Sequence, residues 1–166
     1  MGIDLKNWMQ NLPDGSDLLA LNLCGTHDCV TQHIRLPHFF CCQDLTIYEQ
    51  LLLGVRALDI RVRADGKCLT MVHGIFPAYN HSCHRANLMD MGDVLSQCYR
   101  FLDECPGEAV VFQFKNDNGK ENEQCFDNLF YTYIKGKEPY WYLEDRVPTL
   151  GAARGKLVLI RRCKME

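Results

Sequence analysis

Ionisable residues close several apolar segments of the chain, and their types suit work on a phosphate ester. Two histidines, His27 and His73, each follow a segment rich in apolar residues, and Arg61 and Lys115 lie within or directly after two others. An unperturbed imidazole has a pKa of about 6.5, so one histidine can accept a proton and another can donate one near neutral pH. Fixed cations stabilise the negative charge that grows on a phosphate in the transition state. These residue types suggest the cleavage of a phosphodiester.

Two carboxylates accompany these groups. Asp28 directly follows His27, and Asp59 lies two positions before Arg61, so either carboxylate can orient an imidazole. We expect the remaining histidines by default to be loop residues that are hydrogen-bonded to nearby backbone. They are His33, His38, His81 and His84.

Alternating strands and helices are expected to position the polar groups. Apolar runs predict strands over 18–23, 55–62, 68–72, 109–114 and 156–160, with a turn at Asp65-Gly66. Periodic segments predict helices over 4–12, 44–53, 90–105 and 121–134, with Asp44 as a cap, and a helical turn over 149–153. This order is typical of an α/β fold with a parallel sheet covered by helices, in which chemistry gathers at the carboxyl ends of the strands.

Composition excludes several classes of protein. The 166 residues predict a single domain over 1–166, and 47% hydrophobic with 23% charged residues excludes a disordered or fibrous chain. A net charge of −3 argues against nucleic acid as a partner. No apolar run reaches the roughly 18 residues of a membrane span, and no secretory signal is visible, so a cytoplasmic location is expected by default.

The ten cysteines form no C-x-x-C pair, and we expect most of them to be free thiols in a reducing compartment. The sequence His81-Ser82-Cys83-His84 holds three potential metal ligands but no fourth at usable spacing. We therefore expect neither a metal site nor a cofactor.

Six short motifs together resemble one family. The segments ALNLCGTHD at 20–28, ALDIRVR at 57–63 and VHG at 72–74 resemble the X region of phosphatidylinositol-specific phospholipase C, most closely its bacterial, metal-independent type. The segments FLDECPGE at 101–108, FQFK at 112–115 and GAARGKLVLIRR at 151–162 resemble later parts of that region in the same order. Each motif alone is weak, but the ordered set spans nearly the whole chain.

The resemblance implies a distorted TIM barrel that cleaves phosphatidylinositol at a membrane surface. The inositol 2-hydroxyl attacks phosphorus, diacylglycerol leaves, and a cyclic inositol phosphate forms. By resemblance, His27 is the general base, and His73 is the general acid with Asp28 as its partner. Arg61 neutralises the phosphate and Asp59 helps to hold it.

The resemblance also implies roles for two further cations. Lys115 and Arg162 would bind inositol hydroxyls. In the calcium-dependent relatives, acidic groups hold a metal where Arg61 and Lys115 stand here. The resemblance thus implies no calcium requirement.

Length is the main departure from the family. A TIM barrel usually needs about 250 residues, and this chain resembles only the N-terminal half, ending after the fifth predicted strand. The family's second half supplies the Asp that orients the general base and an aromatic side chain that packs on inositol. A half-barrel exposes apolar strand faces and an edge, so we expect a fragment of a longer protein, or else a homodimer or an inactive remnant.

Two other functions stay open at this stage. One is a catalytically inactive module that binds inositol phospholipid through Arg61, Lys115 and Arg162. The other is a glycerophosphodiester-type enzyme, against which Arg61 argues because that type depends on a metal. Apolar residues at 39–40 and 75–77 lie near the expected mouth, where they either enter a bilayer or belong to the core.

Overall fold

A single mixed sheet organises the chain. The computed structural model describes residue 2 and residues 4–81, 87–117 and 123–162. The strands run in the order β4-β3-β2-β5-β7-β6, and β1 pairs with β2 outside this path. Their bounds are β1 Gly25–Thr26, β2 Ala57–Asp65, β3 Cys68–His73, β4 Phe76–Pro77, β5 Ala109–Asn116, β6 Trp141–Tyr142 and β7 Lys156–Arg161.

Four strand pairings are parallel, as the alternating pattern predicts, but β3 runs antiparallel to β2. The last pair of this ladder joins Asp65 to Cys68, so only Gly66 and Lys67 connect the two strands. A two-residue connection joins antiparallel strands, whereas a parallel crossover needs a dozen residues or more. Gly66 has a φ of +65°, which the tight turn requires and glycine adopts without strain. The predicted turn is confirmed, and the expected parallel sheet is mixed.

The strand predicted over 18–23 is wrong. Leu18–Ala20 is a 3₁₀ turn, which begins at Asp17 because the Asp17 side chain accepts a hydrogen bond from the amide of Leu19 at 2.9 Å. Leu18 is buried, but 63% of Leu19 is exposed, so the segment is not a strand covered on both faces. Strand pairing begins only at Gly25, beside Ala57 of β2.

The helices match their predicted ranges more closely. They are α1 Pro37–Phe40, α2 Ile47–Leu52, α3 Met91–Glu104, α4 Glu123–Ile134 and α5 Leu150–Ala153. Asp90 caps α3 in a reciprocal capping box with Asp93, whereas α2 begins after Thr46, which makes the same motif with Glu49, rather than at Asp44. The segment Leu5–Asn11 is 3₁₀ rather than α-helical and is interrupted at Asn7. α1, the 3₁₀ turns Thr31–His33 and Glu138–Tyr140, and strands β4 and β6 were not predicted.

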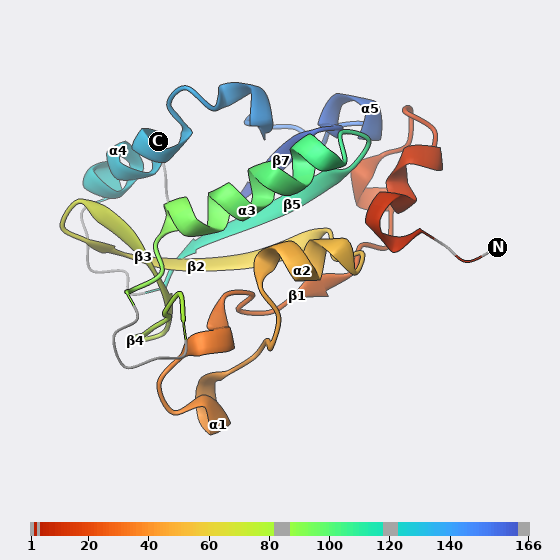
Figure 1. Cartoon of the computed structure of the whole chain (residues 1–166). Helices are drawn as coiled ribbons and strands as arrows, with labels where there is room; N and C mark the ends of the chain where they lie inside the picture. The colour runs from red at the N-terminus through yellow and green to blue at the C-terminus, as the bar shows by residue number, and fades with distance from the viewer. Residues whose placement is uncertain (1, 3, 82–86, 118–122, 163–166) are drawn as a thin grey trace.

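The two faces of the sheet are covered by different parts of the chain. Figure 1 shows α2 and α3 side by side over β2 and β5, and the larger apolar cluster fills this layer. Leu58, Ile60 and Val62 of β2 belong to that cluster, so Asp59 and Arg61 between them point to the opposite, concave face. A smaller cluster around Met9, Leu18, Val111, Leu150 and Val158 covers one part of the concave face.

Within the described ranges, none of the helices combines the length and the apolar character that a membrane span needs.

Candidate active site

The strand register brings the polar residues of β2 and β5 together. Asp59 pairs with Gln113, and Arg61 pairs with Lys115 two residues further along. Neighbouring residues in a parallel ladder share a face, so all four side chains project from the concave side. His27 and Asp28 follow β1, which pairs with the first residues of β2.

Asp28 lies at the centre of the group. It is fully buried and has a φ of +44°, in the left-handed region that Asp tolerates better than most residues. Its Oδ1 lies 3.1 Å from Nε of Arg61. Its Oδ2 lies 3.2 Å from Nε2 of His27 and 3.6 Å from Nε2 of His73. Burial raises the pKa of Asp28 above its ordinary value, although these three groups act in the opposite direction.

Asp59 is the second carboxylate, and it has more hydrogen bonds. Its Oδ2 accepts from Nε of Arg61 at 3.1 Å and from the amide of Asp28 at 3.3 Å, and its Oδ1 accepts from Nε2 of Gln113 at 3.0 Å. Its burial raises the pKa, but the Asp28 amide and the Arg61 guanidinium outweigh that effect and hold the pKa of Asp59 below its ordinary value. The surroundings of Asp59 therefore favour its ionised form, and its hydrogen bond fixes Arg61.

The two histidines have different surroundings. Their ring centroids are 6.4 Å apart, and the planes are nearly perpendicular at 80°. The His27 side chain is 61% exposed, with Nδ1 3.0 Å from Oδ2 of Asp59. The His73 side chain is 25% exposed, and its Nδ1 lies 3.1 Å from the carbonyl oxygen of Phe40. His27 is accessible to a ligand, whereas His73 is held between Asp28 and the end of α1.

Asp117 connects the two sides of the site, a role that the sequence did not reveal. It forms an ion pair with Lys115, and its Oδ2 accepts a hydrogen bond from the amide of Gly74 at 2.7 Å. Its Oδ1 lies 3.8 Å from Nη1 of Arg61. Asp117 thereby ties the residue after His73 to the end of β5. Burial raises the pKa of Asp117, but its bonds to Lys115 and Gly74 hold the pKa below its ordinary value.

The structure brings together all but one of the predicted site residues. Arg162 extends β7 beside Lys115, and its amide donates to the carbonyl of Phe114 at 2.8 Å. Its side chain is exposed, and in the described part of the chain no hydrogen bond or ion pair joins it to the cluster. Gln113 was not predicted as a site residue from the sequence, although its position two residues before Lys115 places it on the same strand face.

Comparisons with known proteins show what the chain is similar to. No family model matches the chain. The 1-phosphatidylinositol phosphodiesterase of Listeria monocytogenes serovar 1/2a is 27% identical over 169 residues, which cover 95% of this chain and 49% of that protein. That of Staphylococcus aureus strain Newman is 28% identical over 166 residues, covering 95% of this chain and 51% of that protein. A crystal structure of phosphatidylinositol-specific phospholipase C from Staphylococcus aureus superposes with a TM-score of 0.79 at 28% identity, over 96% of this chain and 53% of that one.

The chain is homologous to bacterial phosphatidylinositol-specific phospholipase C. It spans about half the length of these relatives. The expected fold class is confirmed, because the phospholipase C neighbours have TIM-barrel-like folds and this α/β chain covers about half of one. The resemblance seen in the ordered sequence motifs is thereby confirmed as well.

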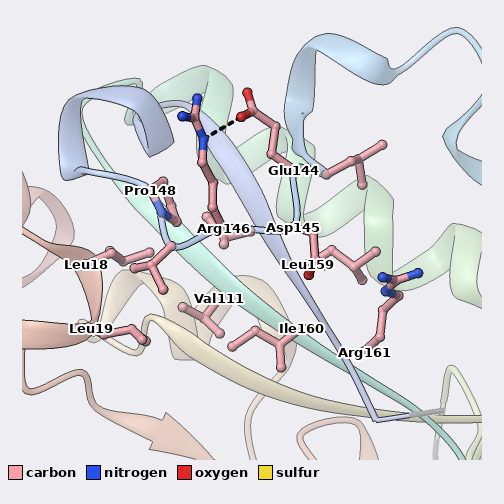
Figure 2. A pocket seen from close by; sticks show the side chains of 13 residues that line it. Leu18, Leu19, Val111, Glu144, Asp145, Arg146, Pro148, Leu159, Ile160 and Arg161 are labelled. Atoms are coloured by element: carbon pink, nitrogen blue, oxygen red, sulfur yellow. Dashed lines mark ion pairs between the residues drawn. The ribbon is translucent and has the colours of Figure 1, made fainter. Parts of the chain in front are cut away.

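The concave face also has a hollow beside β7 and the segment 143–148. A cavity of about 450 Å³ lies there, and Figure 2 shows Leu18, Val111 and Ile160 around it. Its rim carries both signs of charge, and Glu144 and Arg146 pair across 2.7 Å. The two histidines and Asp28 do not line this cavity, so it is separate from the ionisable cluster.

The predicted absence of a metal at 81–84 stays a prediction, because residues 82–86 lie outside the described part of the chain. The seven cysteines whose side chains the structure describes are free thiols, as expected for these positions. They are Cys24, Cys29, Cys41, Cys42, Cys68, Cys98 and Cys105.

Proposed function

We propose that this chain carries the acid–base part of a phosphodiesterase site that cleaves phosphatidylinositol to diacylglycerol and an inositol cyclic phosphate. One observation supports this most directly. His27 and His73 both approach the same oxygen of the buried Asp28, at 3.2 and 3.6 Å, while Arg61 lies 3.1 Å from its other oxygen. A base, an acid and a phosphate-binding cation are thus assembled around one carboxylate.

His27 is the general base in this proposal. It accepts the proton of the inositol 2-hydroxyl as that oxygen forms its bond to phosphorus. Its two ring nitrogens lie 3.2 Å from a carboxylate oxygen of Asp28 and 3.0 Å from one of Asp59, so the imidazolium that forms is stabilised on both sides. The hydroxyl has to displace one of these contacts, and the 61% exposure of the side chain leaves room for the ring to turn.

His73 is the general acid. As the bond from phosphorus to the glycerol oxygen breaks, His73 donates its proton to that oxygen and diacylglycerol leaves. The carbonyl of Phe40 at Nδ1 orients the ring, and the Phe40 ring packs edge-on against it with centroids 5.6 Å apart. On the other side of the ring, Nε2 lies 3.6 Å from Oδ2 of Asp28.

Arg61 neutralises the phosphate oxygens as their charge grows. Asp59 and Asp28 hold its guanidinium in place, so little reorganisation accompanies the reaction. Lys115 and Arg162 supply donors for inositol hydroxyls. Because Arg61 occupies the centre of the site with a fixed positive charge, and calcium needs six to eight oxygen ligands, we propose that turnover requires no calcium and no cofactor.

The substrate is proposed to be met at a membrane surface. Phe39 is 79% exposed and Ile75 is 71% exposed. Phe39 precedes Phe40, which contacts His73, and Ile75 lies two residues after His73. These two side chains therefore project next to the site, where they can enter the interfacial region of a bilayer. Phe40 packs on Phe76 with centroids 4.2 Å apart and is part of the fold.

The test is the release of diacylglycerol and inositol cyclic phosphate from phosphatidylinositol vesicles in the presence of EDTA. The full chain is compared with His27→Ala, with His73→Ala and with His81→Ala, a matched control at an exposed histidine. We expect either site variant to lose about 10²- to 10⁴-fold in rate and the control to keep its rate.

Three results would contradict the proposal. One is equal turnover in His27→Ala, and another is EDTA inhibition that calcium reverses. The third is an inactive chain that still binds inositol phosphate in a calorimeter, which would favour the inactive binding module.

A further inference from the structure

The Cys42 thiol lies beside the acid–base pair, and the proposed reaction gives it no role. Its Sγ is 4.0 Å from Nδ1 of His73. One ring nitrogen of His27, one carboxylate oxygen of Asp28 and this Sγ all lie within 4.8 Å of one another. Imidazole, carboxylate and thiol are the three ligand types that zinc takes in proteins.

The fold builds the thiol into this place. Thr31 is fully buried, and its hydroxyl donates a hydrogen bond to the carbonyl of Asp28 at 2.9 Å. The same hydroxyl accepts a hydrogen bond from the amide of Cys42 at 2.8 Å. One buried side chain thus fixes both the turn that carries Asp28 and the segment that carries Cys42.

Asp28 supplies an independent sign that a cation belongs here. Its side chain is fully buried, and neither carboxylate oxygen accepts a hydrogen bond, although Arg61 and the two imidazoles lie at ion-pair distances. Buried carboxylate oxygens are normally hydrogen-bonded or coordinate a metal. Arg61 approaches Oδ1, so Oδ2 remains directed at the space between the imidazoles.

We propose that His27, Asp28 and Cys42 form a binding site for zinc or another soft divalent ion, with a water or phosphate oxygen as the fourth ligand. Zinc bonds of about 2.0–2.3 Å place tetrahedral ligands about 3.3–3.8 Å apart. The 3.2 Å between Nε2 of His27 and Oδ2 of Asp28 suits this spacing, and the thiol has to approach by roughly 1 Å.

Charge favours zinc over calcium at this position. Binding displaces the Cys42 proton to solvent, and the thiolate with the Asp28 carboxylate balances the two charges of the ion. Arg61 then faces a neutral centre. Calcium prefers oxygen ligands, and the nearby Asp59 is already engaged by Arg61 and Gln113.

Occupation of the site blocks the reaction. The ion takes a nitrogen of the general base and an oxygen of the carboxylate that partners the general acid. This consequence rests on the proposed function, whereas the binding itself does not.

The binding test is calorimetric titration of zinc chloride into the full chain. All proteins carry Cys83→Ser, so that the sequence at 81–84 contributes no thiolate. Cys42→Ser is compared with the parent, and Cys68→Ser serves as the control because Cys68 is likewise a free thiol that lies outside the core. We expect one ion per chain for the parent and the control, and affinity at least about 100-fold weaker for Cys42→Ser, because loss of a direct ligand should cost more than the roughly 10- to 100-fold seen for outer partners of metal sites.

Two further measurements distinguish a failure of the proposed zinc site from a failure of the proposed function. Cobalt in place of zinc should give a thiolate-to-metal charge-transfer absorption that Cys42→Ser abolishes. Zinc should slow phosphatidylinositol turnover of the parent, relative to its own metal-free rate, more than that of Cys42→Ser. Equal zinc affinity in the parent and in Cys42→Ser, or calcium binding as tight as zinc binding, would overturn the proposed site. Zinc binding that depends on Cys42 in a chain without turnover would support the site and contradict only the proposed function.

Discussion

Two arginines, one just before β2 and one within it, pair with carboxylates in different environments. Arg56, just before the strand, is fully buried and pairs with the fully buried Glu108 at 2.7 Å. It also donates to the backbone carbonyls of Leu51, Val55 and Lys6 at 2.7–2.8 Å. Arg61, later in the strand, lies 3.1 Å from both Asp28 and Asp59 and 3.8 Å from Asp117, and its side chain is 15% exposed.

The partners of the two arginines differ even more. Glu108 accepts from Arg56 through one oxygen and from the amides of Met9 and Gln10 through the other. Asp28, beside Arg61, accepts no hydrogen bond through either oxygen. A saturated ion pair contributes a fixed geometry, whereas an unsaturated one keeps lone pairs for a ligand. The first arrangement joins the N-terminal segment to the sheet, and the second belongs to the proposed site.

Removal of the saturated partner should have the largest effect on folding. Glu108→Gln leaves the Arg56 charge buried without compensation, and breaking such a pair costs about 3–5 kcal/mol. We expect urea unfolding to show that loss. Glu104→Gln, which removes an exposed carboxylate paired with Lys6 at 2.9 Å, is the control and should change stability far less. Similar losses in both variants would contradict the contrast between buried and open charges.

Arg61→Lys should affect turnover instead. Lysine keeps the charge but loses the planar fork that contacts Asp28 and Asp59 together. We expect diacylglycerol release to fall by about 10²–10³-fold, the range seen when one preorganised donor to a developing charge is removed. The urea midpoint should move less than in Glu108→Gln. A variant with normal turnover would exclude Arg61 from the phosphate.

The pH dependence of stability should separate Asp28 from Asp59. Folding raises the pKa of Asp28 above 3.8, so the folded chain binds the proton more tightly than the unfolded one. The wild type therefore loses unfolding free energy from this group as pH rises from below 3.8 through the raised pKa. Asp28→Asn lacks this loss, so its stability relative to wild type should rise with pH in that window.

Asp59→Asn should show the opposite slope. Folding lowers the pKa of Asp59 below 3.8, so the wild type gains stability as pH rises from the lowered pKa to 3.8, and the variant does not. Urea midpoints between about pH 2 and pH 7 test both variants, because the window for Asp59 lies below pH 3.8. Equal slopes would show that the two carboxylates share one environment.

The smallest effect is expected at the apolar residues beside the site. The double variant Phe39→Ser and Ile75→Ser removes two exposed side chains without disturbing the core. Full insertion of one apolar side chain contributes about 1.5–3 kcal/mol, so the loss of two side chains that are each about half inserted should lower vesicle affinity by roughly 10-fold or more. Leu53→Ser, which changes an exposed leucine at the C-terminal end of α2, is the control. Unchanged sedimentation with phosphatidylinositol vesicles would discard the membrane role.

Local patterns in the sequence determined most elements from β2 onward and the residue types of the site. The helix α3 and the strands β2, β5 and β7 follow from periodicity and from caps such as Asp90, because these signals lie within a few residues. Polar residues at strand ends, and the ordered motifs, pointed to the two histidines, Asp28 and Arg61. The placement of Asp59 and Arg61 on one face follows from the two-residue repeat of a strand.

Only the tertiary structure decided how these groups are partnered. The apolar run at 18–23 covers the concave face instead of forming a strand, because Asp17 begins a 3₁₀ turn there. Asp117 and Cys42 reach the site through Gly74 and Thr31, which are distant from them in sequence. Arg56 and Glu108 meet across 52 residues. Such contacts depend on the strand register and on which carboxylates accept hydrogen bonds. Neither property can be predicted from a short segment of the sequence.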